Sequence, residues 1–126
     1  MKLRIRGNSI RLRLTKQEVA EFGAGKVVQE SVEFGDGGKL FYRLEISEDS
    51  RGVEARFENG RIALRIPKSQ AEQWAESVQV SFEAKQKLAG GKELRILVEK
   101  DFACLEPRNS EEDADAFPHP SEDARC

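Results

Sequence analysis

The sequence predicts an α+β domain built from about eight mostly antiparallel strands, which form a curved sheet or barrel, and two short helices. Three observations support this class: apolar and polar residues alternate along most of the chain, turn residues separate the alternating segments, and two segments have helical spacing. We expect strands at residues 2–6, 9–14, 26–34, 39–47, 53–58, 61–66, 78–87 and 93–102. The pattern by itself indicates no internal repeat.

Short turn motifs join neighbouring strands into hairpins. Gly7-Asn8 separates the first two alternating segments, and a run of glycine and aspartate at 35–38 separates the next two. Asn59-Gly60 is the strongest of these signals, because both residues readily adopt the positive φ angles of a two-residue hairpin turn. The three turns therefore predict three hairpins.

Two capping boxes predict where the helices begin. Thr15 with Glu18 fits the first box, and Ser69 with Glu72 fits the second. In such a box the hydroxyl accepts a backbone N–H of the first turn, and the glutamate accepts the N–H of the capping residue. The spacing of the second helix places Trp74 on its inward, apolar side.

Charge divides the 126 residues into two parts. Residues 106–126 hold seven carboxylates against two arginines, a net charge of -5, whereas residues 1–105 carry a net charge of +3. Three of the four prolines also lie beyond residue 106. We therefore expect a β-rich domain at residues 1–105 and an acidic C-terminal tail at residues 106–126 with the composition of a loop.

The same composition excludes several classes of function. No apolar run reaches the ~18 residues that a membrane-spanning helix needs, and no apolar segment follows the basic start as in a secretory signal. We therefore expect a cytoplasmic protein with no membrane partner. A body charge of +3 is far below that of a general nucleic-acid binder, so nucleic acid is not an expected partner. A homo-oligomer formed through an exposed edge strand is compatible with this composition.

The polar faces of the predicted strands are rich in arginine. A guanidinium binds phosphate oxygens through two parallel hydrogen bonds, so arginine on a shared face suggests an anion site. Two architectures fit this pattern: an open sheet with helices on its apolar side, or a barrel with the charged face turned inward. The candidates are Arg4, Arg6, Arg11, Arg13, Arg43, Arg56, Arg61, Arg65 and Arg95, with Glu45, Glu54, Glu58, Glu83, Glu93 and Glu99 at the same phase.

The function that this face predicts is binding of a phosphate-bearing or polyanionic small molecule on a concave sheet face. Carboxylates among the arginines could hold Mg2+ against the phosphates. The alternative is a non-enzymatic protein-interaction or structural domain, in which the charges form solvated cross-strand pairs worth under ~1 kcal/mol each. The expected ligand-binding residues are Arg4, Arg6, Arg11, Arg13, Arg43, Arg56, Arg65, Arg95, Glu45, Glu83, Lys85 and Glu99.

Residues near the C-terminus suggest a third hypothesis, a metal site. Cys104, His119 and Cys126 are possible ligands together with an acid of the tail, although no Cys-x-x-Cys spacing is present. His119 is the only histidine and lies in the tail. Hydrolysis by a serine or cysteine with a histidine base is therefore not expected.

The last third of the chain carries a family resemblance. The segments Glu-Lys-Asp-Phe-Ala-Cys-Leu at 99–105 and Phe-Pro-His-Pro at 117–120, with an acidic stretch between them, resemble a family of short uncharacterised bacterial proteins. The alternation of residues 1–15 also fits this family, so the resemblance covers the whole chain. It implies a bacterial cytosolic protein without an assigned activity, in which Phe117 could anchor the tail to the body.

The charged strands resemble, more weakly, the CYTH-like triphosphate tunnel enzymes. That resemblance implies an eight-stranded antiparallel barrel lined by Arg, Lys and Glu, acting on triphosphates with Mg2+ or Mn2+. The hallmark of those enzymes is a Glu-x-Glu-x-Lys strand near the N-terminus, whereas residues 2–6 read Lys-Leu-Arg-Ile-Arg. The closest match is at residues 81–85, which contain Glu83 and Lys85 but lack the first glutamate. The resemblance therefore supports an architecture more than an activity.

Overall fold

The computed structural model describes residues 1–102 and residue 117. Within these residues the predicted α+β class is confirmed, with eight strands and two α-helices. The elements in chain order are β1 (Lys2–Arg6), β2 (Ser9–Leu14), α1 (Lys16–Gly23), β3 (Val28–Gly35), β4 (Gly38–Ser47), β5 (Glu54–Glu58), β6 (Arg61–Pro67), α2 (Lys68–Glu76), β7 (Ser81–Lys87), the 3-10 turn η1 (Ala89–Gly91) and β8 (Glu93–Lys100).

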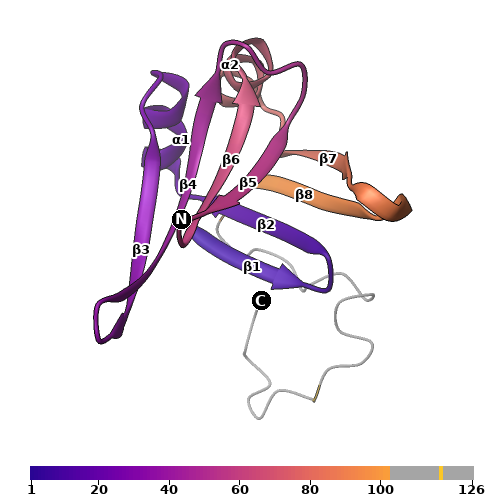
Figure 1. Ribbon diagram of the computed structural model, residues 1–126. Helices are drawn as coiled ribbons and strands as arrows, with labels where there is room; N and C mark the ends of the chain where they lie inside the picture. Colours follow the sequence, from indigo (N-terminus) through magenta and orange to yellow (C-terminus); the bar gives the residue numbers. More distant parts are fainter. Residues whose placement is uncertain (103–116, 118–126) are drawn as a thin grey trace.

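The strands form two separate four-stranded sheets. Sheet A has the order β1-β2-β8-β7 and sheet B the order β3-β4-β6-β5. Outer pairs are antiparallel hairpins, whereas the central pairs β2/β8 and β4/β6 are parallel. Figure 1 shows the upright strands of sheet B crossing those of sheet A at a steep angle. The expected single curved sheet or CYTH-like barrel is therefore wrong, because each sheet ends in edge strands that no ladder joins to the other sheet.

The fold contains a repeat that the sequence pattern did not reveal. The series β1, β2, α1, β3, β4 is followed by the same series β5, β6, α2, β7, β8, and each sheet takes two strands from each half. The sequence agrees at the strand-to-helix junctions, where Ile-Arg-Leu-Arg-Leu-Thr-Lys at 10–16 matches Ile-Ala-Leu-Arg-Ile-Pro-Lys at 62–68. The expectation of no internal repeat is therefore wrong.

The hydrophobic core lies between the two sheets and the helices. Leu12 and Leu14 of sheet A and Leu44 and Leu64 of sheet B are fully buried, and all belong to one cluster. Alternation along each strand then turns the charged side chains to the outer faces. A barrel with its charged face inward is thus ruled out, because the apolar faces fill the space between the sheets.

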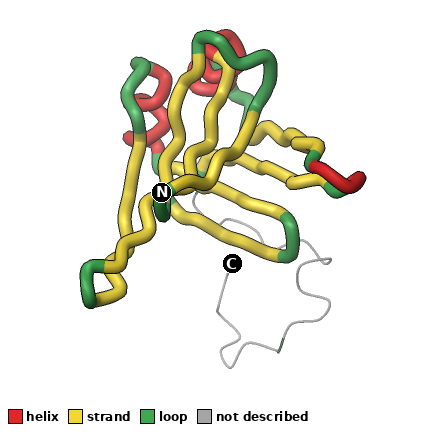
Figure 2. The backbone as a smooth tube through the Cα atoms, in the orientation of Figure 1, coloured by secondary structure: helices red, strands yellow, loops and turns green. Residues whose placement is uncertain are grey.

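The two helices pack together at one end of the molecule (Figure 2). The capping box of α1 is confirmed: the Thr15 hydroxyl accepts the Glu18 N–H at 3.3 Å, and the Glu18 carboxylate accepts the Thr15 N–H at 2.9 Å. The second box is wrong, since Pro67 is the N-cap of α2 and no side chain caps that helix. A Cβ on Gly23 would lie 2.8 Å from the Ala75 Cβ, so glycine permits this close helix contact.

Trp74 links the helices to sheet A. Its ring is fully buried and makes edge-to-face contacts with Phe22 of α1 and Phe82 of β7, at centroid distances of 6.1 and 5.2 Å. The indole N–H donates to the Val80 carbonyl at 3.2 Å, which satisfies its polar atom. The predicted inward position of Trp74 is confirmed.

Hydrogen bonds and ion pairs join the edges of the two sheets at two places, which we call the β1–β3 seam and the β5–β7 seam. At the β1–β3 seam the Met1 α-amino group binds the carboxylates of Glu18 at 2.6 Å and Glu30 at 3.1 Å. The Tyr42 hydroxyl donates to Glu30 at 2.7 Å, and burial together with the Glu30 carboxylate raises the pKa of Tyr42 to about 12. At the β5–β7 seam the Gln86 amide bonds both the N–H and the carbonyl of Ala55.

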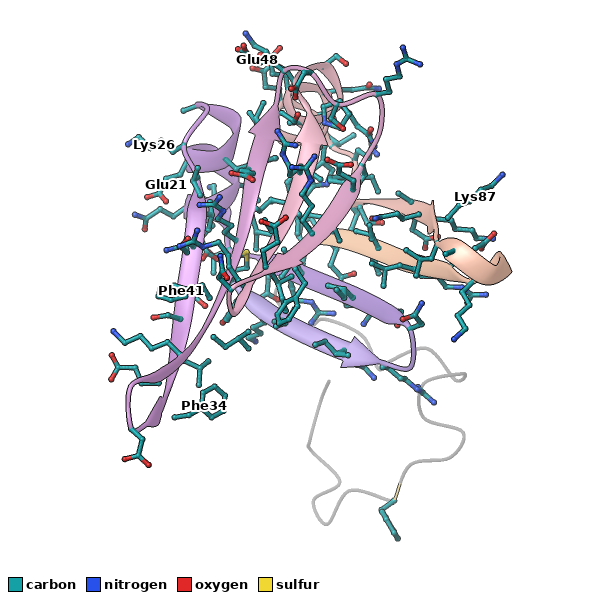
Figure 3. All side chains as sticks on the ribbon, in the orientation of Figure 1. Glu21, Lys26, Phe34, Phe41, Glu48 and Lys87 are labelled. Carbon is teal, nitrogen blue, oxygen red and sulfur yellow. The ribbon has the colours of Figure 1, made fainter. Side chains whose placement is uncertain are left out.

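Large apolar side chains are also exposed away from the core. Phe34 lies near the tip of the β3–β4 hairpin (Figure 3) and is 71 % exposed, and Phe57 of β5 is 68 % exposed. Val78 and Val80, expected in a strand, precede β7 and are also exposed. None of the described helices has the length and apolar character needed to span a membrane.

Candidate functional site

All twelve predicted ligand-binding residues lie on outer sheet faces, but not on the same one. Strand alternation and the burial of the intervening side chains place eight on sheet A and four on sheet B. The sheet A residues are Arg4, Arg6, Arg11, Arg13, Glu83, Lys85, Arg95 and Glu99, and the sheet B residues are Arg43, Glu45, Arg56 and Arg65. The prediction of one shared concave face is therefore wrong, because the chain divides its charged strands between two sheets.

The outer face of sheet B contains a hollow of about 310 Å³, which we call the sheet B hollow. Three neighbouring strands, β4, β6 and β5, supply its walls. Ala63 lies at its centre in β6, where a small side chain leaves room between longer neighbours. The lining residues are Arg43, Glu45, Arg56, Glu58, Asn59, Arg61, Ala63 and Arg65.

The sheet B hollow carries an excess of positive charge. Four of its lining residues are arginines and two are glutamates, so the formal charge of the lining is +2. The fork of each guanidinium can bind two oxygens of a phosphate or carboxylate at once. The arrangement can therefore bind an oxyanion, and it contains no histidine, serine or cysteine that could act as a nucleophile or base.

Arg65 is the most extensively paired of these arginines. It contacts Glu45 at 3.7 Å, Glu54 at 3.2 Å and Asp49 at 3.4 Å. The hydrogen bond from the Ser47 hydroxyl, with the nearby Arg65 charge, holds the pKa of Asp49 below its ordinary value. Arg65 is thus held by carboxylates on three sides and has a structural role at the edge of the hollow.

Arg43 and Arg61 are less committed to protein partners. Arg43 approaches Glu45 at 3.4 Å through one terminal nitrogen, and its buried Nε has no hydrogen-bond partner among the described residues. The Arg61 guanidinium lies over the Phe41 ring, 5.4 Å from its centroid. A cation–π contact leaves the N–H groups of a guanidinium available, so these two side chains can donate to an anion in the hollow.

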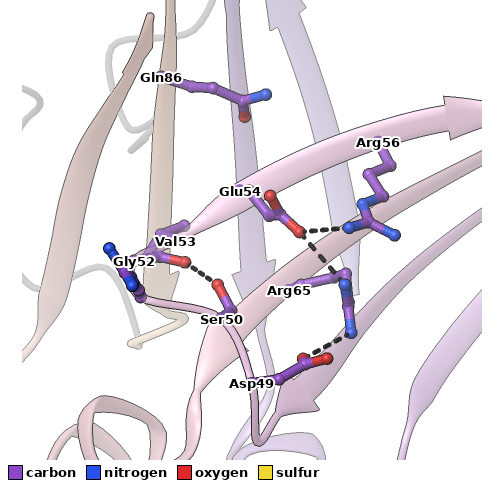
Figure 4. A pocket seen from close by; sticks show the side chains of 9 residues that line it. Asp49, Ser50, Gly52, Val53, Glu54, Arg56, Arg65 and Gln86 are labelled. Carbon is purple, nitrogen blue, oxygen red and sulfur yellow. Dashed lines mark hydrogen bonds and ion pairs between the residues drawn. The ribbon is translucent and has the colours of Figure 1, made fainter.

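A second hollow of about 490 Å³ adjoins the first at the β4–β5 loop (Figure 4). Figure 4 shows Arg56 and Arg65 both reaching Glu54, and Arg65 also reaching Asp49. Arg56 and Arg65 line both hollows, while Gln86 closes this one on the side of β7. Two of its three arginines, Arg56 and Arg65, are paired with carboxylates, so these two offer an anion less than Arg43 and Arg61 of the sheet B hollow do.

On sheet A, Glu99 organises the centre of the outer face. Its carboxylate accepts from Arg13 at 2.8 Å and lies 3.8 Å from Arg11. Arg13 and Glu99 are cross-strand neighbours, as are Arg65 and Glu45 on sheet B. Beside this pair a hollow of about 370 Å³ is lined by Ser9, Ile10, Arg11, Glu83, Ala84, Lys85, Arg95, Ile96 and Leu97. The repeat therefore places one arginine–glutamate pair at the centre of each outer face.

No metal site is found among the residues that the structure describes. Among residues 1–102 and 117, no three His, Cys, Asp or Glu side chains gather as a metal site would require. Cys104, His119 and Cys126 lie outside the described residues. Phe117 is described and is 98 % exposed, so the expected anchoring of this side chain to the body is wrong.

Sequence reasoning missed two features of the sheet B hollow. Ala63 was not a candidate, because an alanine carries no chemistry of its own, and Asn59 was interpreted only as a turn residue. Arg61 and Glu58 are among the charged candidates but not among the expected ligand-binding residues. The strand register of the β5–β6 hairpin could have identified Arg61 and Glu58, because the two residues are cross-strand neighbours.

Comparisons with known proteins assign a family to the chain without an activity. A family model described as a family of unknown function, DUF7009, matches residues 1–121. No curated protein and no solved structure matches the chain. The match agrees with the expected resemblance to a short uncharacterised family, and nothing in it supports a resemblance to CYTH-like proteins.

Proposed function

The chain belongs to DUF7009, a family of unknown function, and we propose that it binds a small phosphate-bearing molecule in the sheet B hollow. The observation that carries this proposal is the presence of four arginines around a space left open by Ala63. A volume of about 310 Å³ is within the range, roughly 300–1,000 Å³, of small-molecule sites. Bacterial origin and a cytoplasmic location remain predictions of the sequence.

The contacts of the four arginines indicate that they have different roles in the site. Arg65 and Arg56 are held by Glu54 and set the shape of one wall. Arg43, with its Nε unpaired among the described residues, and Arg61, stacked on Phe41, are the donors that would bind phosphate oxygens. A buried N–H without an acceptor costs about 1–3 kcal/mol, and an anion that draws the Arg43 guanidinium toward it would relieve that cost.

The two glutamates of the hollow limit the anions that fit. Glu45 and Glu58 repel an anion in proportion to its charge, but the four arginines attract it more, so the net charge of +2 favours a ligand with several negative charges over a monoanion. Their oxygens are also the ligands that Mg2+ prefers, so Mg2+ carried by a di- or triphosphate would reduce the repulsion. Binding of a polyphosphate group should therefore be stronger with Mg2+ than without it.

Isothermal titration of tripolyphosphate, pyrophosphate and ATP, each with and without Mg2+, tests the proposal. Arg43→Gln should weaken binding about tenfold or more, because a hydrogen bond between charged groups contributes roughly 1.5–3 kcal/mol. The matched control is Arg11→Gln, which removes the same charge from sheet A and should change Kd less than about twofold. Absence of binding by any of the three ligands, or an equal loss in both variants, would contradict a site on sheet B.

The exposed apolar side chains support the alternative, a protein-interaction domain. Phe34, Phe57 and Ile5 are 71 %, 68 % and 59 % exposed, and large exposed aromatic residues are frequent at interfaces. In that case the phosphate ligands leave the protein unchanged, while Phe34→Ser and Phe57→Ser abolish a concentration-dependent increase in molecular mass measured by light scattering. The titration and the scattering experiment thus separate the two classes.

A further inference from the structure

The outer face of sheet A differs from that of sheet B in carrying a large excess of positive charge. Its outward positions hold eight cations against the three carboxylates Glu83, Glu93 and Glu99, a net charge of +5. We call this surface the basic face; its cations are Lys2, Arg4, Arg6, Arg11, Arg13, Lys85, Lys87 and Arg95. All four strands lie within the described residues.

The strand register places like charges directly opposite one another on the basic face. Lys2 pairs with Arg13 across β1 and β2, and Lys85 pairs with Arg95 across β7 and β8. Directly opposed like charges destabilise a sheet, and the carboxylates of Glu99 and Asp101 offset only part of this repulsion. An anionic chain across the face would neutralise the rest, so the face fits a polyanionic partner.

The chemistry of the basic face favours carboxylates over nucleic acid. No outward position of β1, β2, β7 or β8 carries an aromatic ring, and Leu97 is the only large apolar side chain among them. Proteins that bind single-stranded nucleic acid normally stack bases on aromatic side chains. Arginine forks without such rings are suited to acidic peptide segments, in which each carboxylate accepts two N–H groups.

We propose that the basic face binds the chain's own acidic segment, residues 106–126. The segment carries a net charge of -5, opposite in sign to the +5 of the strand positions, which becomes +4 when the Asp101 carboxylate beside Lys2 and Arg13 is counted. It follows β8, a central strand of this sheet, after only a few residues, since β8 ends at Lys100. A tether this short holds the carboxylates at a high effective concentration near the face, which an external polyanion would have to exceed. The segment is thus an intramolecular competitor for any anionic partner of sheet A.

The proposal is independent of the proposed phosphate site, because the two surfaces lie on different sheets. The carboxylates would occupy the Arg11 and Arg95 side of sheet A, whereas Arg43 and Arg61 line sheet B. Failure of the tail interaction therefore leaves the titration of the sheet B hollow unaffected, and failure of phosphate binding leaves the tail interaction unaffected.

A spin label on Cys126 tests the interaction in the full-length chain. With Cys104→Ser as the only other change, Cys126 is the single thiol, and its label broadens the amide signals of residues that it approaches. We expect loss of most of the signal intensity at β1, β2 and β8 in low salt, and recovery in about 1 M salt, where the Debye length is ~3 Å. Signals of β3 to β6 should keep their intensity and serve as the internal reference.

A charge-neutralised tail provides the matched control. Replacing four acids in the labelled chain (Glu111→Gln, Glu112→Gln, Asp113→Asn and Asp115→Asn) should restore the sheet A signals in low salt. Uniform broadening of both sheets, broadening that persists in the neutralised chain, or no broadening at all would overturn the proposal. Broadening that disappears on dilution would overturn it too, because it would assign the contact to a second molecule. Tight binding of a single-stranded oligonucleotide that is insensitive to the tail charges would instead assign the basic face to nucleic acid.

Discussion

The outer faces of the two sheets share one framework and differ in what surrounds it. Arg13 with Glu99 on sheet A and Arg65 with Glu45 on sheet B are equivalent cross-strand pairs. Beside them, the position of Arg11 on sheet A corresponds to that of Ala63 on sheet B. Both faces have a hollow beside the pair, of about 370 Å³ on sheet A and about 310 Å³ on sheet B, but Arg11 lines the first whereas Ala63 lies at the centre of the second.

This difference shows how equivalent strands of a repeated fold can carry two different surfaces. Equivalent strands keep buried aliphatic side chains and the central ion pair, since both halves need the same packing. The outward positions next to that pair are free of this constraint, so sheet B can carry the short Ala63, which leaves room in its hollow, where sheet A carries the long Arg11. Equivalent substitutions in the two halves should thus have similar effects when they are made in the core and different effects when they are made on the outer faces.

The largest expected effect is on the core, where the halves should behave alike. Leu12→Ala and Leu64→Ala each remove a fully buried side chain at equivalent positions in β2 and β6. Each should lower the free energy of unfolding by about 2–5 kcal/mol, from lost burial and the cavity left behind. Urea denaturation measures both, and a large effect in only one half would show that the two repeats are not equivalent in stability.

Placing at position 63 the residue that sheet A carries at the equivalent position should fill the sheet B hollow. Ala63→Arg places the side chain of sheet A at the centre of the sheet B hollow, and it should weaken tripolyphosphate binding at least about tenfold, or ~1.4 kcal/mol. Ala63→Ser is the matched control and should leave binding nearly unchanged. Retention of binding by Ala63→Arg, with an unchanged circular dichroism spectrum, would place the phosphate elsewhere.

The two central ion pairs should differ in strength because their geometry differs. Arg13 approaches Glu99 at 2.8 Å, whereas Arg65 approaches Glu45 at 3.7 Å. Double-mutant cycles with glutamine at each position should give a coupling free energy of about 1 kcal/mol for the first pair and about 0.5 kcal/mol or less for the second, since all four side chains are partly solvated. Equal coupling energies would mean that the extra partners of Arg65 compensate for its longer contact.

The smallest expected effect is a difference in pH dependence between the two seams. Burial lowers the pKa of the Met1 α-amino group, but hydrogen bonds and charges from Glu18 and Glu30 outweigh it and raise the pKa above 8.0. Burial has the opposite effect on a carboxylate and raises the pKa of Glu18, but hydrogen bonds from the Met1 amine and Thr15 outweigh it and lower that pKa below 4.5. The Met1 amine therefore stabilises the fold fully below about pH 8, and this stabilisation is lost as pH rises through the folded pKa of the amine. The Glu18 carboxylate stabilises the fold above about pH 4.5, and this stabilisation is lost as pH falls through the folded pKa of Glu18.

Thermal unfolding between pH 4 and pH 10 measures this difference. Glu18→Gln should flatten the pH profile at both ends, with a change of about 1 kcal/mol or less because the seam is partly exposed to solvent. Gln86→Ala, at the other seam, removes the amide bonds to Ala55 and should lower stability equally at every pH. A pH-dependent effect of Gln86→Ala would contradict the assignment of the pH response to the β1–β3 seam.

Local signals in the sequence predicted most of the elements correctly. The Asn59-Gly60 turn, the Thr15 capping box and the alternation of β2 and β6 are set by residues adjacent in the chain, and all three are confirmed. The box at Ser69 and Glu72 is wrong because Pro67 starts α2 earlier. The match between residues 10–16 and 62–68 was the signal that could have revealed the repeat.

The sequence by itself determined which side chains share a face, because alternation depends only on the two-residue period of a strand. The tertiary structure decided where those faces lie. Parallel pairing of β2 with β8 and of β4 with β6 joins segments far apart in the chain, so no local pattern encodes it. That pairing divides the arginines between two sheets. The arginines face outward because burial of the apolar faces between the sheets is the dominant favourable term in folding, and because buried unpaired charges are costly.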